Sequence, residues 1–319
     1  MTQNSPKYSF VMPAYKAQFI HEAVDSILKQ TLPDFELIIV DDDSPEQLDV
    51  ILSKFNDSRI RYYKNQQNIG GKDLVAQWNH SLKYSMGKWI ILATDDDVYD
   101  LNFLKKADEL LNKYPTSNIF RARVAICDAN GSVYAIEPCM PERTTKDELL
   151  YSMFNGLYGG VPQYVINKNK LDEVGGFLSY PKAWGSDDYT ALLLSDNGII
   201  FSDEVLLKFR MSSINISSQI YDVEEKLKAR ILYYKNLYDE LISKWIIQVQ
   251  ENTIYESRIV KQYKMWFWKD MLMYLHMIPL NQRYKLFPMI ASNTPYFTLK
   301  EKRKLFFRAY LKKIRINMA

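Results

Sequence analysis

The feature that most constrains the fold is a short apolar run followed by three carboxylates. Residues 89–93 read WIILA, and so short and apolar a run predicts a strand buried on both faces. Asp95, Asp96 and Asp97 come next, and a helical pattern begins at Asn102. We therefore expect the three aspartates at the carboxyl end of a buried strand, where open α/β sheets bind their ligands.

Three adjacent carboxylates repel one another unless a cation or hydrogen-bond donors offset their charge. Mg²⁺ and Mn²⁺ bind one or two carboxylates together with phosphate oxygens. The triplet therefore suggests a divalent cation that carries a diphosphate. The alternative is an exposed turn in which one aspartate caps the following helix.

The segments before the triplet alternate between strand and helix patterns. They are a strand at 8–12 that Pro13 ends, a helix at 19–28, a strand at 35–40, a helix at 48–55, a strand at 59–63 and a helix at 73–84. This alternation predicts βαβ units, hence an α/β fold with a mixed, mainly parallel sheet flanked by helices. The chain lacks the glycine motifs of dinucleotide-binding and P-loop enzymes, which disfavours both classes.

Three stretches, in this order, resemble the family 2 glycosyltransferases, which have the GT-A fold. They are FVMPAYKAQFIHEAVDSILKQTLPDFELIIVDDDSPEQ, NIGG and ILATDDDVYDLNFL. The resemblance covers about residues 8–215. It implies a nucleotide-diphosphate sugar donor with a UDP-sugar favoured, Mn²⁺ or Mg²⁺ as cofactor, and transfer with inversion at the anomeric carbon.

The resemblance also assigns residues to the donor and the metal. Those implied in donor binding are Pro13, Ala14, Tyr15, Asp41, Asp42, Asn68, Gly70, Lys72, Asp95 and Arg210. The implied metal ligands are Asp96 and Asp95, with Asp97 assisting. Many relatives carry a histidine beyond the base region, but residues 208–213 contain none, so this segment is not favoured as a metal ligand.

The next hundred residues form the acceptor half. We expect a β-hairpin from 118–126 and 132–136, a helix at 146–154 and a strand at 164–166. By the resemblance, the acceptor contacts Trp184 and a glycine-rich acceptor segment, residues 155–161, through Tyr158, Gly159 and Gly160. The Gly-Gly-Phe segment at 175–177 leads to the catalytic base. That base is one of Asp187 and Asp188, with Asp187 preferred; it takes the proton of the acceptor hydroxyl. The alternative is an acidic pair that stabilises a helix N-terminus.

The last hundred residues read as helices rich in aromatic side chains. We expect a catalytic domain at 1–215, with its donor half ending near residue 100, and a helical region at 216–319. Residues 300–319 contain eight Lys or Arg and one acid. This basic aromatic helix predicts contact with a membrane surface. The alternatives are a solvated basic face and a homodimer interface; nothing else in the chain favours nucleic acid.

The N-terminus lacks a signal-peptide pattern, and no apolar run approaches the roughly 20 residues that span a bilayer. We therefore expect a cytoplasmic protein, peripheral on the inner face of the membrane. The expected function is transfer of one sugar to a glycan or a lipid-diphosphate-linked acceptor in surface-polysaccharide synthesis, such as capsule or O-antigen. The alternatives are a sugar-nucleotide nucleotidyltransferase and a non-catalytic nucleotide-sugar-binding module.

Overall fold

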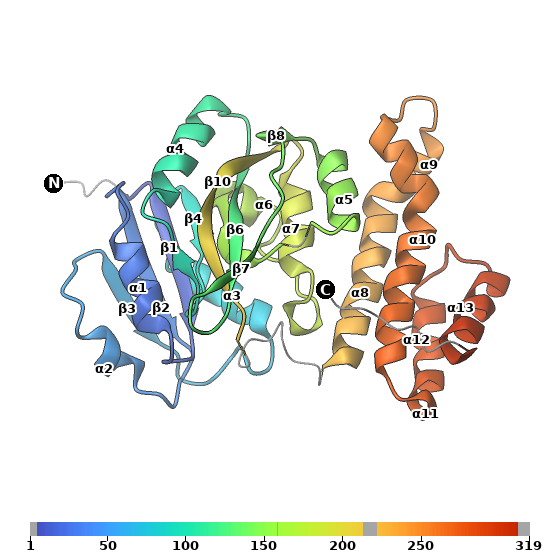
Figure 1. Cartoon of the computed structure of the whole chain (residues 1–319), viewed down its shortest axis with the longest axis horizontal. Helices are drawn as coiled ribbons and strands as arrows, with labels where there is room; N and C mark the ends of the chain where they lie inside the picture. The colour runs from blue at the N-terminus through green and yellow to red at the C-terminus, as the bar shows by residue number, and fades with distance from the viewer. Residues whose placement is uncertain (1–4, 158, 213–221, 312–319) are drawn as a thin grey trace. The chain divides into compact units, whose positions relative to one another are not determined.

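The computed structural model describes residues 5–157, 159–212 and 222–311 (Figure 1). The chain divides into two compact units, one comprising Met1–Ser179 with Ser186–Ser218 and the other Tyr180–Gly185 with Gln219–Ala319. The boundary predicted at 215/216 falls outside the described residues, as does the predicted acceptor residue Tyr158.

The first unit is built on one mixed sheet with the strand order β3-β2-β1-β4-β9-β6-β10-β5, to which β7 is added beside β6 and β8 beside β10. The strands are β1 (Tyr8–Ala14), β2 (Phe35–Asp41), β3 (Ile60–Lys64), β4 (Trp89–Leu92), β5 (Val98–Tyr99), β6 (Ile119–Cys127), β7 (Val133–Ile136), β8 (Arg143–Thr144), β9 (Tyr164–Asn167) and β10 (Ile199–Arg210). The longest ladders, β1/β2, β2/β3 and β6/β10, are parallel. The predicted βαβ architecture and the β6/β7 hairpin are thereby confirmed.

Helices of the first unit flank this sheet (Figure 1). They are α1 (Ile20–Leu28), α2 (Leu48–Leu52), α3 (Leu74–Leu82), α4 (Phe103–Lys113), α5 (Lys146–Phe154), α6 (Lys168–Glu173) and α7 (Ser186–Leu194). Alternate β1 residues, Tyr8, Phe10 and Met12, share one core cluster with the apolar sides of α1 and α4. Ser9 points to the opposite face, where its hydroxyl donates to Glu36. The two-residue period of the strand thus decides which side chains meet which helices.

The first strand does not stop at Pro13 as predicted; it continues to Ala14. Proline has no N–H to donate, so within a sheet it is confined to positions where no partner needs one. Pro13 meets this condition because the pairing of β1 with β4 ends at Val11 and Leu92, and beyond that point only β2 pairs with β1.

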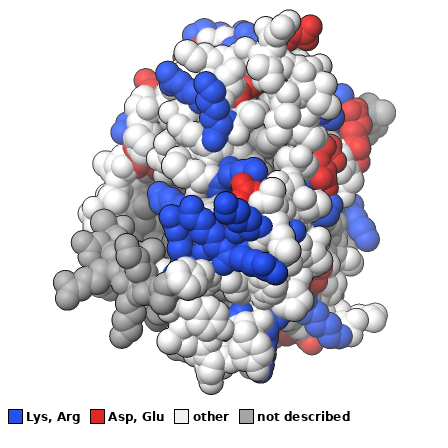
Figure 2. Space-filling model, turned by 90° about the vertical axis from the view of Figure 1, so that its right-hand side faces the viewer, with Lys and Arg blue, Asp and Glu red and all other residues white. Residues whose placement is uncertain are grey.

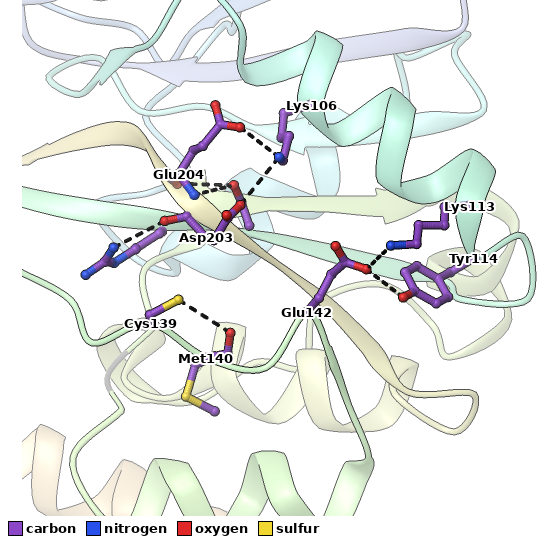
Figure 3. Close-up of polar contacts among 10 residues, drawn as sticks. Lys106, Lys113, Tyr114, Cys139, Met140, Glu142, Asp203 and Glu204 are labelled. Carbon is purple, nitrogen blue, oxygen red and sulfur yellow. Dashed lines mark hydrogen bonds and ion pairs between the residues drawn. The ribbon is translucent and has the colours of Figure 1, made fainter.

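Strand β10 was not predicted, because polar residues interrupt its apolar pattern. Asp203 and Glu204 are exposed in its middle and both contact Lys106 of α4, at 3.4 Å and 2.7 Å from its Nζ (Figure 3). The same region carries a second link, from Lys113 and Tyr114 to Glu142, each at 2.6 Å. These polar contacts join α4 to β10 and the end of α4 to the segment before β8.

The second unit is helical, as expected. Its elements are α8 (Val223–Leu237), a π-helical turn η4 (Tyr238–Ile242), α9 (Ser243–Ile247), α10 (Ile254–Met277), α11 (Leu280–Arg283), a 3₁₀ turn η5 (Tyr284–Leu286), α12 (Phe287–Ser292) and α13 (Leu299–Leu311). In the part of the chain that the structure describes, no helix combines the length and apolar character needed to cross a bilayer.

The aromatic residues of α10 form the core of this unit and not a membrane-facing surface. Tyr234 of α8 packs against Tyr263 and Phe267 of α10, with ring centroids 5.7 Å and 5.2 Å apart. Trp266 is also buried. The Trp- and Met-rich run of α10 therefore supplies core residues of this unit.

A buried ion pair joins α8 to α10. Both Nε and Nη2 of Arg230 donate to Asp270 Oδ2, at 2.9 Å and 2.6 Å, and both side chains are largely buried. Replacing Asp270 by Ala leaves a buried guanidinium unpaired, so we expect a loss of about 3 kcal/mol in the free energy of unfolding. Urea unfolding measures it.

The matched control is Lys235→Ala, which breaks the exposed pair with Asp239 in the same unit. An exposed pair four residues apart contributes about 0.5 kcal/mol or less. Equal losses in the two variants would contradict the importance of the buried pair.

Candidate active site

The carboxyl ends of β1, β2 and β4 meet at one edge of the sheet, and the predicted donor residues lie there. Asp95, just beyond β4, accepts hydrogen bonds from the backbone N–H groups of Tyr15 and Lys16 at 3.0 Å and 2.9 Å. Ala14 accepts the N–H of Asp42 at 2.9 Å. The loop after β1 is therefore tied to both acidic clusters, although these lie far apart in the sequence.

Asp41 and Asp42 are almost completely buried at the end of β2 and shape the loops around them. Asp41 accepts from the N–H of Ser44 at 2.7 Å and from Tyr62 at 2.7 Å. Asp42 accepts from the N–H groups of Ile69 and Gly70 at 2.9 Å and 2.7 Å. These contacts fix the conformation of the loop that lies beyond each carboxylate.

Gly70 approaches the Asp42 carboxylate closely. A Cβ added at Gly70 would lie 3.0 Å from Asp42 Oδ2. Asn68 supports the same turn by donating to the carbonyl of Asp42 at 3.1 Å. Lys72, the other donor candidate here, is exposed, and its predicted role remains a prediction.

The three carboxylates after β4 have different surroundings. Asp97 is buried, and its Oδ1 accepts the backbone N–H of Arg210 at 2.8 Å. Burial, together with the neighbouring Asp96, raises the pKa of Asp97 well above its usual value. Burial raises the pKa of Asp96 to about 6, and the Asp95 carboxylate adds to the shift. A positive charge beside Asp96 and Asp95 would stabilise the charged carboxylates and so lower the pKa of Asp96 again.

These carboxylates do not converge as a three-ligand metal site. Among the described residues, no group of three or more His, Cys, Asp or Glu side chains is placed to hold a metal ion. Asp95 and Asp96 still offer hard oxygen donors, and Mg²⁺ and Mn²⁺ bind such pairs together with phosphate oxygens. The residues present thus fit a cation that arrives with a diphosphate.

Arg210 lies inside the site, but its hydrogen bonds are to the protein. Its Nε and Nη1 donate to the carbonyls of Asp96 and Ala129, both at 2.9 Å, and its Nη2 contacts Glu22 Oε2 at 2.6 Å. The side chain is 2% exposed. These contacts give Arg210 a structural role, and its predicted contact with the donor phosphates has no support from this geometry.

A set of close approaches leads from the triplet to Asp188, one of the two candidates for the base. Phe209 precedes Arg210, and its ring would lie 3.0 Å from a Cβ added at Gly160. Tyr99, two residues after Asp97, donates to the carbonyl of Pro162 at 2.9 Å. A Cβ added at the neighbouring Gly159 would lie 2.5 Å from Asp188 Oδ1. The glycine-rich acceptor segment therefore lies between the triplet and Asp188.

Asp187 and Asp188 occupy the first turn of α7, where the helix dipole favours negative charge. Asp187 Oδ1 accepts the N–H of Asp188 at 3.0 Å. Burial nevertheless raises the pKa of Asp187 to about 7, with the Asp188 carboxylate adding to the shift and Arg121 opposing it. A carboxyl group that titrates near neutral pH is suited to accepting a proton.

The glycine pair before α7 turns the chain back toward the sheet. Gly175 and Gly176 have φ angles of 86° and 87°, in the left-handed region that favours glycine. Asn79 of α3 accepts the N–H of Phe177 and donates to its carbonyl, both at 2.9 Å. Asn79 was not singled out in the sequence, because no local pattern shows a partner about a hundred residues away.

Trp184, predicted to bind the acceptor, belongs to the helical unit with the rest of Tyr180–Gly185. Its indole N–H donates to Tyr274 at 2.8 Å, and Lys226 Nζ lies 4.3 Å from its ring centroid. These contacts account for the position of the Trp184 side chain without an acceptor, so its role in acceptor binding remains a prediction. Arg121 was also overlooked, although a charged residue within the apolar run 119–127 is an available signal.

The raised pKa of Asp187 predicts that the protein loses stability as the pH rises. The folded protein binds this proton more readily than the unfolded chain between about pH 4 and pH 7, so stability falls as the pH rises through that range. Asp187→Asn removes the cost, and we expect its free energy of unfolding to exceed that of the wild type at pH 8 by on the order of 1 kcal/mol. The difference should shrink toward pH 4 in urea unfolding curves.

The exposed Asp172, changed to Asn, controls for loss of one negative charge. A gain for Asp187→Asn that is the same at every pH would contradict this explanation.

Solved structures share this fold. S. aureus TarS 1-349 in complex with UDP-GlcNAc superposes with a TM-score of 0.65 at 18% identity, covering 95% of this chain and 89% of that one. The mannosyltransferase PcManGT of Pyrobaculum calidifontis, in complex with GDP-Man and Mn²⁺, gives 0.51 at 14% identity, covering 97% and 85%. These similarities concern the fold, and they confirm the GT-A expectation.

Sequence relatives agree. The Escherichia coli UDP-Glc:alpha-D-GlcNAc-diphosphoundecaprenol beta-1,3-glucosyltransferase WfgD is 29% identical over 243 residues, covering 72% of this chain and 90% of that protein. The putative colanic acid biosynthesis glycosyl transferase WcaA of E. coli K12 is 31% identical over 142 residues, covering 44% of this chain and 49% of that protein. The model of glycosyl transferase family 2 matches residues 9–175, more than half of the chain. The protein therefore belongs to glycosyl transferase family 2 and is a glycosyltransferase.

Proposed function

We propose that this glycosyltransferase moves a sugar from a UDP-sugar to a hydroxyl of a lipid-diphosphate-linked glycan, with inversion, in the synthesis of a bacterial surface polysaccharide. The observation that carries the proposal is the set of contacts that joins Asp96 and Asp97 to Asp188 through Phe209, Arg210 and the glycine-rich segment. These contacts support a donor diphosphate beside Asp96 and a catalytic base at Asp187 or Asp188 within the same site.

The chemistry assigned to this neighbourhood is a single displacement. The acceptor oxygen attacks the anomeric carbon, its proton passes to a carboxylate, and the bond from that carbon to the diphosphate oxygen breaks. Asp187 and Asp188 are the candidates for the base. Asp188 is favoured by its position, because its Oδ1 faces Gly159, whereas Asp187 Oδ1 accepts the N–H of Asp188.

The donor side of the proposal rests on the loops after β1, β2 and β4. Pro13 and Ala14 at the end of β1 would line the nucleoside together with Tyr15, whose backbone N–H binds Asp95. A divalent cation held by Asp96 with Asp95 would supply positive charge beside the diphosphate. UDP is proposed as the nucleotide because WfgD is named for UDP-Glc and TarS was solved with UDP-GlcNAc.

A lipid-linked acceptor is proposed because the name of WfgD specifies a diphosphoundecaprenol acceptor. We propose that α13 brings the protein to an anionic membrane surface. Its outer side exposes Lys300, Arg303, Lys304 and Arg308 beside Phe307, which is 65% exposed. Lys and Arg side chains gather near the middle of the face drawn in Figure 2, which views the right-hand side of Figure 1, where α10 and α13 lie.

That surface has little acidic charge of its own. Glu301, the one acid of α13, pairs with Lys264 of α10 at 2.8 Å. Exposed cations next to an exposed aromatic ring are typical of helices that lie in the membrane interface. Residues 312–319, which include more of the predicted basic tail, lie outside the described residues.

The donor proposal predicts metal-dependent nucleotide binding. UDP with Mn²⁺ should raise the thermal midpoint more than GDP, CDP or dTDP, because a ligand of the folded state stabilises it by about 2.7 kcal/mol at 100 times its Kd. Asp96→Ala should lose the part of the shift that depends on Mn²⁺. Asp188→Asn should keep the whole shift but lose release of UDP from a UDP-sugar in the presence of acceptor.

Asp172→Asn, exposed and in the same unit, is the control and should behave as the wild type in both assays. A wild-type midpoint that no nucleotide moves, with or without metal, would remove the donor assignment. Full turnover by both Asp187→Asn and Asp188→Asn would remove the proposed base.

The membrane proposal predicts salt-sensitive binding to vesicles of phosphatidylcholine with phosphatidylglycerol. Each exposed cation near an anionic surface contributes about 1 kcal/mol, so Lys300→Gln, Arg303→Gln and Lys304→Gln together should weaken partitioning roughly a hundredfold. Co-sedimentation measures the bound fraction.

The control changes the exposed lysines 54, 83 and 105 of the first unit to Gln, with the same loss of charge. Equal weakening in both triple variants would show a general charge effect and not a docking surface. A change of oligomeric state in the α13 variant, without a change in vesicle binding, would instead favour the homodimer interface.

A further inference from the structure

The hydroxyl of Tyr164 is a buried polar group that the fold leaves without a partner. Tyr164 is the first residue of β9 and is 1% exposed. Within residues 5–157, 159–212 and 222–311, its hydroxyl has no hydrogen-bond partner. Burying a hydroxyl without a hydrogen bond costs stability, so the position calls for another explanation.

The hydroxyl lies near Asp188, the candidate for the base that its position favours. A Cβ added at Gly159 would lie 2.6 Å from the Tyr164 hydroxyl and 2.5 Å from Asp188 Oδ1. Both oxygens thus approach the same point beside the Gly159 backbone, and only the hydrogen atom of a glycine leaves room for them. The start of β9, the glycine residue five positions before it and the first turn of α7 meet at this point.

Charged groups surround the ring of Tyr164. Arg121 of β6 is directly opposite Tyr164 in the antiparallel β6/β9 register, and its guanidinium lies 6.0 Å from the ring centroid. Arg121 pairs with Glu137 at 2.6 Å. Asp187 and Asp188 are the other charged groups that act on the hydroxyl, and burial with these carboxylates raises its pKa far above the usual value. The hydroxyl therefore keeps its proton and can act as a donor.

We infer that Tyr164 is a positioning residue whose hydroxyl donates a hydrogen bond to the Asp188 carboxylate and holds it toward the glycine-rich acceptor segment. The inference rests on the proposed function, because it concerns the base of that reaction. Both oxygens lie within 2.6 Å of the same Cβ position at Gly159, which places them in one small region beside that residue.

This role differs from a packing role in its effect on pH dependence. A hydrogen bond to the charged form of a carboxyl group lowers its pKa. Loss of the Tyr164 hydroxyl would therefore raise the pKa of the base. The acidic limb of the pH profile of kcat/KM would then move to higher pH, since the carboxylate would be protonated at a pH where it is now charged.

The test compares Tyr164→Phe with Tyr8→Phe. Tyr8 is also fully buried, but its hydroxyl already donates to Asp108 at 2.8 Å at the opposite end of the sheet. We expect Tyr8→Phe to lower the thermal midpoint and to leave kcat and the pH profile unchanged. Tyr164→Phe should keep or raise the midpoint, lower kcat at least about tenfold, leave the KM of the UDP-sugar unchanged and shift the acidic limb upward.

Tyr164→Phe overturns the inference if it retains wild-type kcat, if kcat falls without a shift of the acidic limb, or if its midpoint falls as far as that of Tyr8→Phe. Asp188→Asn separates this failure from failure of the proposed function. Normal turnover in Asp188→Asn would overturn the inference and leave Asp187 as the candidate base. Normal turnover in both Asp187→Asn and Asp188→Asn would overturn the proposed base as well. An inactive Asp188→Asn beside a normal Tyr164→Phe would overturn the inference alone.

Discussion

The arrangement of the site depends on the hydrogen bonds and the ion pair of the buried residue Arg210. It contacts the carbonyl of Asp96 and the carboxylate of Glu22, while its own N–H binds Asp97. An unpaired guanidinium inside a protein is strongly destabilising, so these partners are held where the charge requires them. Because Phe209 packs beside Gly160, fixing the end of β10 also fixes the segment that leads to Asp188.

The carboxylates of the site fall into two groups. Asp41, Asp42 and Asp95 accept backbone N–H groups of neighbouring loops, so their charge is used to set loop conformation. Asp96 and Asp187 are buried beside another carboxylate, and their pKa values rise to about 6 and about 7. Carboxylates whose charge the fold offsets only in part are the ones available to a cation or a proton, and such groups cluster at functional sites.

Much of the fold could be predicted from the sequence, because it depends on local periodicity. The strand of WIILA, the hairpin of β6 and β7 and the helix α5 all lie where their patterns indicate. Strand β10 was missed, because Asp203 and Glu204 interrupt its pattern and their partner, Lys106, is about a hundred residues away. The burial of the aromatic run of α10 could not be predicted, because composition alone does not distinguish an interfacial helix from a buried one.

The sequence by itself determined which residue types stand at the ends of the strands, since a buried strand must stop before its polar residues begin. It thereby determined the positions of the acidic triplet and of the pair Asp41 and Asp42. It also determined the resemblance to family 2, which the family model confirms. Only the tertiary structure decided the role of each carboxylate. Burial and hydrogen bonding depend on groups distant in the chain: Arg210 satisfies Asp97, and Tyr164 faces Asp188 across Gly159. No local pattern encodes such contacts, because these residues meet only when the sheet has formed.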